Sequence, residues 1–119
     1  MMEVSIGGRR YHLHAADRNG AWTAHAERAD SGARFGIECP GSTEPEAVAR
    51  LERWLNWQHE HASALAALQD VQRAYHRTVA GEAFGRAADG SPVGAERTSL
   101  DELEAAGARL ADVRARMPI

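Results

Sequence analysis

The feature that most constrains this fold is a run of 37 residues, from Glu44 to Ala80, that contains no glycine and only one proline. Pro45 falls in the first turn of the expected helix, where its missing N–H would have no helical partner anyway. Thr43 and Glu46 form a capping box, so we expect one helix over residues 43–80. At about 1.5 Å per residue this helix is roughly 55 Å long, about twice what a domain of this size spans comfortably.

A stripe of mostly apolar side chains follows the helical repeat along this segment. The stripe is longer than a small sheet and a short second helix can cover, so we expect a second copy of the chain to bury it in a homodimer. His61 and Gln72 lie within the stripe and would fix the register of that seam. The predicted interface residues are Trp54, Trp57, His61, Leu65, Leu68, Gln72, Tyr75 and Val79.

The first forty residues alternate between apolar and polar side chains, which is typical of half-buried strands. Asn19 and Gly20 form a two-residue hairpin turn, for which positive φ is required. We interpret Gly7 and Gly8 as a bulge or a bend within the first strand. The pattern predicts a three-stranded antiparallel β-meander over residues 1–41.

The Asn19-Gly20 turn also predicts the register, in which His14 faces His25 and Trp22 lies on the apolar face. The opposite face then carries four candidate metal ligands: His12, His14, His25 and Glu27. Cross-strand neighbours lie about 5 Å apart at Cβ, close enough for two imidazoles to share zinc or another transition metal. Two other interpretations stay open: a solvated polar face of an open sheet, and a sheet-to-sheet interface.

After the long helix, residues 81–98 contain four glycines and predict a loop that starts at Gly81 as a helix C-cap. Ser99 and Glu102 form a second capping box, so we expect a C-terminal helix over residues 99–117. The predicted fold is a single α+β domain over 1–119: a three-stranded antiparallel β-meander, one long α-helix, a loop and a shorter C-terminal α-helix.

Charge and composition restrict the partners. The net charge is −3 and the fourteen basic residues are scattered along the chain, which disfavours nucleic acid because non-specific binding needs a basic face. The sequence lacks a run of about 20 apolar residues, so we expect no membrane span. The single cysteine, Cys39, cannot form a disulfide within the chain, and the first eleven residues do not resemble a signal peptide. We therefore expect a cytoplasmic protein.

Part of the sequence resembles a known family. Its features are an aromatic residue in a strand, a hairpin turn preceded by an acidic residue and followed by Trp, and a Gly-x-Thr-x-x-Glu-Ala opening of a helix. They comprise Tyr11, Asp17, Asn19, Gly20, Trp22, Gly41, Thr43, Glu46 and Ala47. Over residues 11–55 this order resembles the N-terminal domain of the HicB-type antitoxins. The chain departs from that pattern where residues 29–32 replace a Pro-Asp-x-Pro-Gly stretch, and its helix is about twice as long. The resemblance implies a dimeric binding domain that masks a small toxin or contacts RNA.

These patterns favour a non-catalytic interaction or regulatory module that acts as a homodimer, antitoxin-like or as an inhibitor of a protein partner whose identity the sequence does not give. The His-Glu-x-x-His spacing of metalloproteases is absent from the sequence, and no catalytic triad or carboxylate pair can be assembled from it. We therefore expect no catalytic residues and no cofactor. The alternative is a metal-binding or His-dependent catalytic protein that uses the histidine-bearing sheet face.

Overall fold

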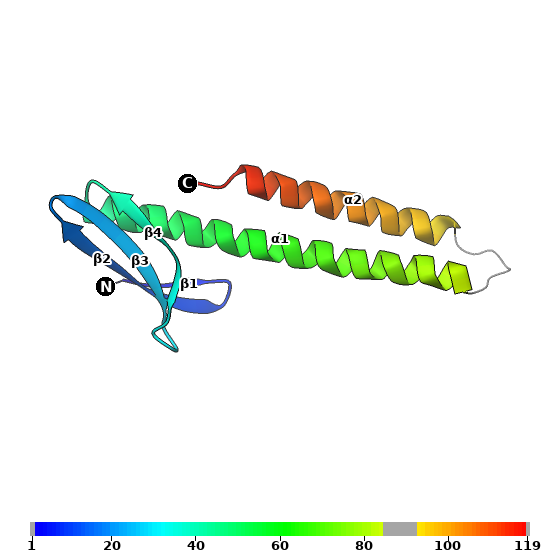
Figure 1. The fold of residues 1–119 in the computed structure, drawn as a ribbon, viewed down its shortest axis with the longest axis horizontal. Coiled ribbons are helices and arrows are strands. Elements are labelled where there is room, and N and C mark those ends of the chain that lie inside the picture. Colours follow the sequence, from blue (N-terminus) through cyan, green and yellow to red (C-terminus); the bar gives the residue numbers. More distant parts are fainter. Residues whose placement is uncertain (1, 85–92, 119) are drawn as a thin grey trace. The chain divides into compact units, whose positions relative to one another are not determined.

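The computed structural model describes residues 2–84 and 93–118, and it has an α+β architecture (Figure 1). In chain order the elements are β1 (Met2–Ile6), β2 (Arg9–Arg18), β3 (Ala21–Arg28), β4 (Arg34–Gly41), α1 (Glu44–Phe84) and α2 (Val93–Ala115). They form two compact units, which we call the sheet unit (residues 1–59 with 117–119) and the helical unit (residues 60–116). The single domain over 1–119 stays a prediction.

The antiparallel sheet has four strands in the order β1-β2-β3-β4, so the prediction of three strands is wrong. Gly7 and Gly8 are not a bulge within one strand. They form the turn between β1 and β2, with φ of 60° and 81°, and Ile6 pairs with Arg9 across it. Glycine adopts positive φ without steric cost, so a Gly-Gly pair closes a two-residue hairpin as Asn-Gly does.

The predicted register between β2 and β3 is confirmed. His14 pairs with His25, and Asp17 pairs with Trp22. Asn19 and Gly20 have φ of 58° and 84°, as a turn with two left-handed residues requires. The turn gains a further contact because the Gly20 N–H donates a hydrogen bond to Asp17 Oδ1 at 2.9 Å. The local turn chemistry therefore determines which side chains share each face.

The pairing of β4 is irregular at the position where Trp54 of α1 packs against the strand. Between the pairs Ala24–Cys39 and Ala26–Phe35 the register of β4 shifts, and within the shift Gly36 has φ of 82°. A Cβ atom on Gly36 would lie 2.4 Å from the ring of Trp54, so the indole packs directly against backbone. The absence of a side chain at this position allows the helix to approach the sheet closely.

The core of the sheet unit lies between one face of the sheet and the first turns of α1. Thr43 caps the helix as predicted: its hydroxyl accepts a hydrogen bond from the Glu46 N–H at 3.2 Å. The buried core residues are Ile6, Tyr11, Leu13, Ala24, Ala26, Cys39, Ala47, Leu51, Trp54 and Leu55, and Trp22 and Trp57 pack against them. Apolar burial at this interface is the main source of stability of the unit.

In the helical unit, α1 and α2 present stripes with alternating spacings of three and four residues, the repeat of coiled coils. On α1 the half-buried or buried positions include His61, Ala64, Leu68, Val71, Tyr75 and Thr78. On α2 they include Ser99, Leu103, Ala106, Leu110 and Val113. Polar contacts between the two helices include one in which Arg114 Nε donates to His61 Nε2 at 3.3 Å, and one in which Arg116 Nη1 lies 3.3 Å from Glu60 Oε2.

Both predicted boundaries of the loop are wrong. The first helix continues through Gly81 to Phe84, and the second starts at Val93 rather than at the Ser99 capping box. One glycine inside a helix costs only about 1 kcal/mol, which neighbouring helical turns can offset. Ser99 is therefore an interior position of α2, half-buried in its stripe. Residues 85–92 of the predicted loop lie outside the described residues.

Candidate functional site

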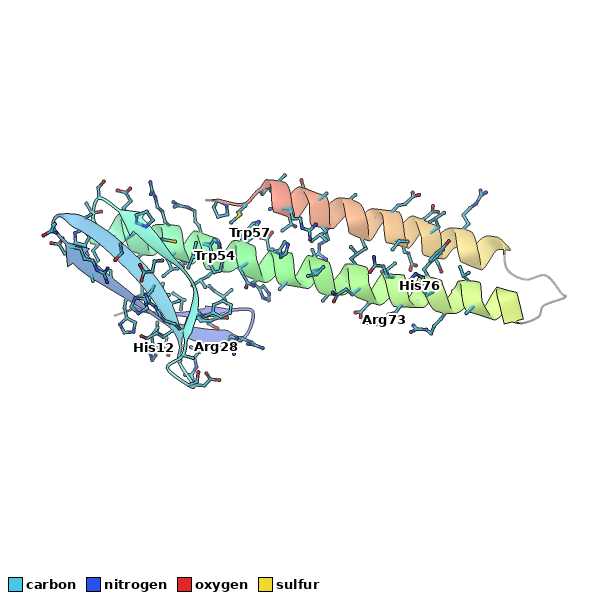
Figure 2. All side chains as sticks on the ribbon, viewed as in Figure 1. His12, Arg28, Trp54, Trp57, Arg73 and His76 are labelled. Carbon is cyan, nitrogen blue, oxygen red and sulfur yellow. The ribbon has the colours of Figure 1, made fainter. Side chains whose placement is uncertain are left out.

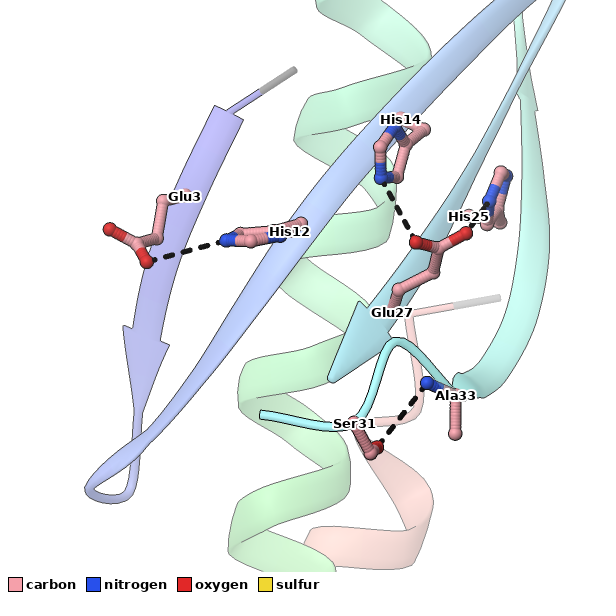
Figure 3. A network of polar contacts seen from close by, with 7 residues as sticks. All are labelled: Glu3, His12, His14, His25, Glu27, Ser31 and Ala33. Carbon is pink, nitrogen blue, oxygen red and sulfur yellow. Dashed lines mark hydrogen bonds and ion pairs between the residues drawn. The ribbon is translucent and has the colours of Figure 1, made fainter. Parts of the chain in front are cut away.

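The four predicted ligands all belong to the sheet face that points away from the core, which we call the outer face. Strand alternation places His12 and His14 there from β2, and His25 and Glu27 from β3 (Figure 3). Their side chains are between 29 % and 35 % exposed, so each is partly shielded by its neighbours but open to solvent.

Glu27 joins two of the histidines. Its Oε1 lies 3.2 Å from His25 Nε2, and its Oε2 lies 3.2 Å from His14 Nε2 (Figure 3). The two imidazole rings stack with centroids 5.2 Å apart and an angle of 18° between their planes. The carboxylate therefore bridges both rings, with one contact along β3 and one diagonal contact across to β2.

The two contacts of Glu27 are not equivalent. The contact with His25 has hydrogen-bond geometry. His14 Nε2 is shielded from solvent, and its 3.2 Å contact with Glu27 Oε2 lacks hydrogen-bond geometry. A shielded polar nitrogen without a hydrogen bond is unfavourable, so this atom could gain a proton donor, a water molecule or a cation as a partner.

The hydrogen bond from His25 lowers the pKa of the Glu27 carboxyl, and the positive charge of protonated His14 and His25 lowers it further. Partial burial acts in the opposite direction but is outweighed by the hydrogen bond. The Glu27 side chain is therefore a carboxylate at neutral pH.

His12 is not part of this bridge. It is the Cα partner of Glu27, but its Nε2 lies 3.4 Å from Glu3 Oε1 on the neighbouring strand β1 (Figure 3). Glu38, a further carboxylate near the predicted site, instead pairs with Arg34 on its own strand. Glu3 was not predicted to take part because residues 2–6 were not expected to form a separate strand. The Gly7-Gly8 pair was the feature that could have revealed it.

Within the part of the chain that the structure describes, no three His, Cys, Asp or Glu side chains are placed together as ligands of a metal ion. Cys39, the sole thiol of the sequence, lies on the opposite side of the sheet in the core. Burial raises the pKa of the Cys39 thiol, and the nearby charges of Arg50 and Arg53 only partly oppose this effect.

The eight predicted interface residues divide between the two units. Trp54 lies in the core of the sheet unit, and Trp57, one turn further along α1, is half-buried and packs against that core (Figure 2). On the helical unit, four are half-buried and two are exposed. The half-buried ones are His61, Leu65, Leu68 and Tyr75, and the exposed ones are Gln72 and Val79. Val71, Ala74 and Thr78 occupy half-buried positions that the predicted stripe omitted. A seven-residue repeat continued from Trp54 and Trp57 reaches positions 64, 71 and 78, whereas the predicted stripe used Leu65, Gln72 and Val79, one residue further along the chain in each case.

No family model matches the chain, and searches of curated proteins and of solved structures return no significant match. The resemblance of residues 11–55 to the HicB-type antitoxins therefore stays a prediction. None of the helices described is long and apolar enough to cross a membrane.

Proposed function

We propose that this protein is a non-catalytic interaction module that acts as a homodimer, with the helical unit as the dimerisation surface. The observation that carries the proposal is the uneven burial along the helical unit. Its fully buried apolar residues, among those described, are Ala64, Leu110 and Val113. These three lie near the end where Arg114 contacts His61, and the stripe beyond them is only half covered.

The contact between Arg114 and His61 sets the antiparallel register, in which Tyr75 lies about level with Leu100. In this region Leu68 and Tyr75 are half-buried, while Val79 and Leu100 are 37 % and 40 % exposed. Two helices alone cannot enclose large side chains, because each helix faces only one neighbour. Two copies of the hairpin packed together would give a four-helix bundle, in which every apolar stripe has partners on two sides.

A second copy is the occupant that fits these stripes best, because the coiled-coil spacing on both helices suits packing against helices of the same repeat. An isologous interface also needs one surface patch rather than two complementary ones. The sheet unit would then present its outer face twice, once per protomer. An antitoxin-like role, in which this face binds and inhibits a protein partner, is the form of the proposal that the resemblance over residues 11–55 favours.

Sedimentation equilibrium over a micromolar concentration series tests the dimer. We expect a mass of twice 12.9 kDa for the wild-type chain. The double variant Val79→Glu/Leu100→Glu should sediment as a monomer with its helical circular dichroism retained, because both changed positions are solvent-exposed in the single chain. The control Gln69→Glu adds one negative charge, half of that in the double variant, at an exposed position of α1 and should stay dimeric. A mass near 12.9 kDa for the wild type at all concentrations contradicts the proposal.

A second candidate function is transition-metal binding at the outer face, and one observation favours it. His14 Nε2 is shielded and without a hydrogen bond, beside the carboxylate of Glu27 that also holds His25. Neutral imidazole nitrogen and carboxylate oxygen are ordinary zinc ligands. Excess Zn²⁺ should then raise the melting temperature of the wild type but not of His14→Asn. His76→Asn, at an exposed position of α1, is the control. An equal response of wild type and His14→Asn excludes this site.

A further inference from the structure

A hollow at one end of the sheet brings together arginines that are distant in the sequence. It is a cavity of about 480 Å³ lined by Gly8, Arg9, Arg10, Arg28, Ala29 and Asp30. The lining residues come from the β1–β2 turn, the start of β2, and the end of β3 with the residues that follow it. Antiparallel pairing explains their proximity, since Tyr11 pairs with Arg28 and the Ala29 N–H donates to the Arg10 carbonyl at 3.1 Å.

The side chains of Arg9 and Arg28 leave the sheet on the same face. Arg9 and Tyr11 share a face by strand alternation, and Arg28 lies opposite Tyr11. Arg9 is exposed, and no carboxylate of the described residues forms an ion pair with it. Arg28 likewise has no ion pair with a described carboxylate, but its guanidinium stacks over the Phe35 ring at 5.2 Å from the centroid. The Arg9 guanidinium therefore has no ion-pair partner among the described residues. The Arg28 guanidinium is oriented by the Phe35 ring but keeps its positive charge.

Arg10 also lines the hollow, but by strand alternation its side chain leaves the sheet on the outer face, together with that of His12. Its Nη1 lies 3.9 Å from Glu3 Oε1, a separation too long for a hydrogen bond. Asp30 is the one acidic residue of the lining, beside the two guanidiniums of Arg9 and Arg28 that share a face of the sheet. The whole chain is acidic, with a net charge of −3, so this concentration of positive charge does not follow from the overall composition. It is a local property produced by the pairing of β2 and β3.

The backbone around the hollow is held in place. The Arg28 N–H donates to the Ala33 carbonyl and the Gly32 N–H to the Arg28 carbonyl, both at 2.8 Å. Ser31 Oγ accepts from the Ala33 N–H at 3.3 Å (Figure 3). A backbone fixed in this way reduces the ordering cost that a ligand would have to offset.

We propose that this hollow binds the phosphate group of a small organic phosphate, with Arg9 and Arg28 as the two ligating guanidiniums. Arginine suits this ligand because its planar fork donates two parallel hydrogen bonds to phosphate oxygens. The cavity volume falls within the range of small-molecule sites, about 300–1,000 Å³, and exceeds what a bare inorganic ion needs. The proposal is independent of the homodimer, because the lining residues all belong to the sheet unit.

Inorganic phosphate is the probe for the test, titrated into ¹⁵N-labelled protein at about pH 8, where it is a dianion, with ionic strength held constant by sodium chloride. We expect saturable amide shifts at Gly8, Arg9, Ala29 and Asp30. Arg9→Gln, a change at an exposed position that should leave the fold intact, should raise the Kd about tenfold, the usual effect of losing one charge-assisted hydrogen bond.

Two further variants test whether changes in the Kd are specific to the hollow. Asp30→Asn removes the single negative charge from the lining and should lower the Kd several-fold, which a general loss of structure would not do. Arg109→Gln, an exposed arginine of α2, removes the same charge far along the sequence and should leave the Kd unchanged. Non-saturable shifts would indicate an adventitious ion only. That outcome, or equal Kd values for Arg9→Gln and Arg109→Gln, overturns the proposal.

Discussion

Glu27 connects the side chains of the outer face, because its carboxylate contacts His14 with one oxygen and His25 with the other. The pKa of the Glu27 carboxyl is lowered in the folded state, chiefly by the hydrogen bond from His25. A carboxyl with a lowered pKa stabilises the fold above its ordinary pKa, and this contribution is lost as the pH falls through the folded-state value.

We therefore expect the wild type to lose stability more steeply than Glu27→Gln as the pH falls below about 4.5. The amide introduced by this substitution does not titrate, so the variant should be less stable than the wild type at neutral pH and approach it in acid. Urea denaturation at a series of pH values measures this difference. Parallel stability curves for the two proteins would show that the bridge contributes nothing to pH dependence.

Gly36 is the residue at which the fold depends most directly on the lack of a side chain. In Gly36→Ala the new Cβ meets both a left-handed φ of 82° and the Trp54 ring at 2.4 Å. We expect a loss of about 2–4 kcal/mol in the free energy of unfolding, from the backbone term and overpacking together. Gly32→Ala is the matched control, because Gly32 has φ of 72° with open space around it. The control should lose only about 1–2 kcal/mol, and equal losses would show that the contact with Trp54 costs nothing.

At the scale of elements, turn chemistry made the β2–β3 hairpin predictable and helix ends less so. Asn19 and Gly20 determine one register, and that register alone places His14 across from His25. The same pairing opposes Arg10 to Ala29, so the location of the arginine hollow was implicit in the sequence. The register did not predict which side chains make contact. Glu27 contacts His14, its diagonal neighbour on β2, and not His12, the residue directly opposite.

Helix ends were harder to predict because the features used are local, whereas helical stability comes from packing. Gly81 and Ser99 have the chemistry of a C-cap and an N-cap, yet both lie inside helices. The β4 irregularity at Gly36 could not be predicted from local patterns either, because it depends on the packing of Trp54, which lies on α1 eighteen residues further along the chain.

The stripe of α1 yields a prediction at this scale. Leu68 is half-buried in the helical unit, whereas Asp70 is exposed and forms an ion pair with Arg73. Leu68→Asp should lower the free energy of unfolding by about 2–3 kcal/mol, since a charge on the apolar stripe must be desolvated or displace the helix. Asp70→Ala should change it by less than about 0.5 kcal/mol, because exposed i, i+3 pairs contribute little. Thermal denaturation followed by circular dichroism compares them, and equal melting temperatures would contradict the assigned helical phase.

At the scale of the whole molecule, the two units differ in how much apolar surface each encloses. The sheet unit encloses a core of ten buried residues, whereas the helical unit encloses three among those described. A unit that encloses so little apolar surface has a small hydrophobic core. Burial of its remaining apolar surface against a second copy would therefore increase its free energy of unfolding. Self-association would therefore contribute directly to the stability of the chain and would not be a consequence of a fold that is already stable.

This argument predicts a melting temperature that depends on protein concentration. For a dimer that dissociates on unfolding, each tenfold rise in concentration adds about 1.4 kcal/mol to the stability, which raises the melting temperature by a few degrees, on the order of 2–6 °C. The variant Val79→Glu/Leu100→Glu should melt at a temperature that does not depend on concentration, because the exposed apolar positions would no longer join two copies. Differential scanning calorimetry over two decades of concentration is the measurement. A wild-type melting temperature that stays constant while sedimentation reports a dimer would mean that the helical hairpin is stable alone and that association serves recognition only.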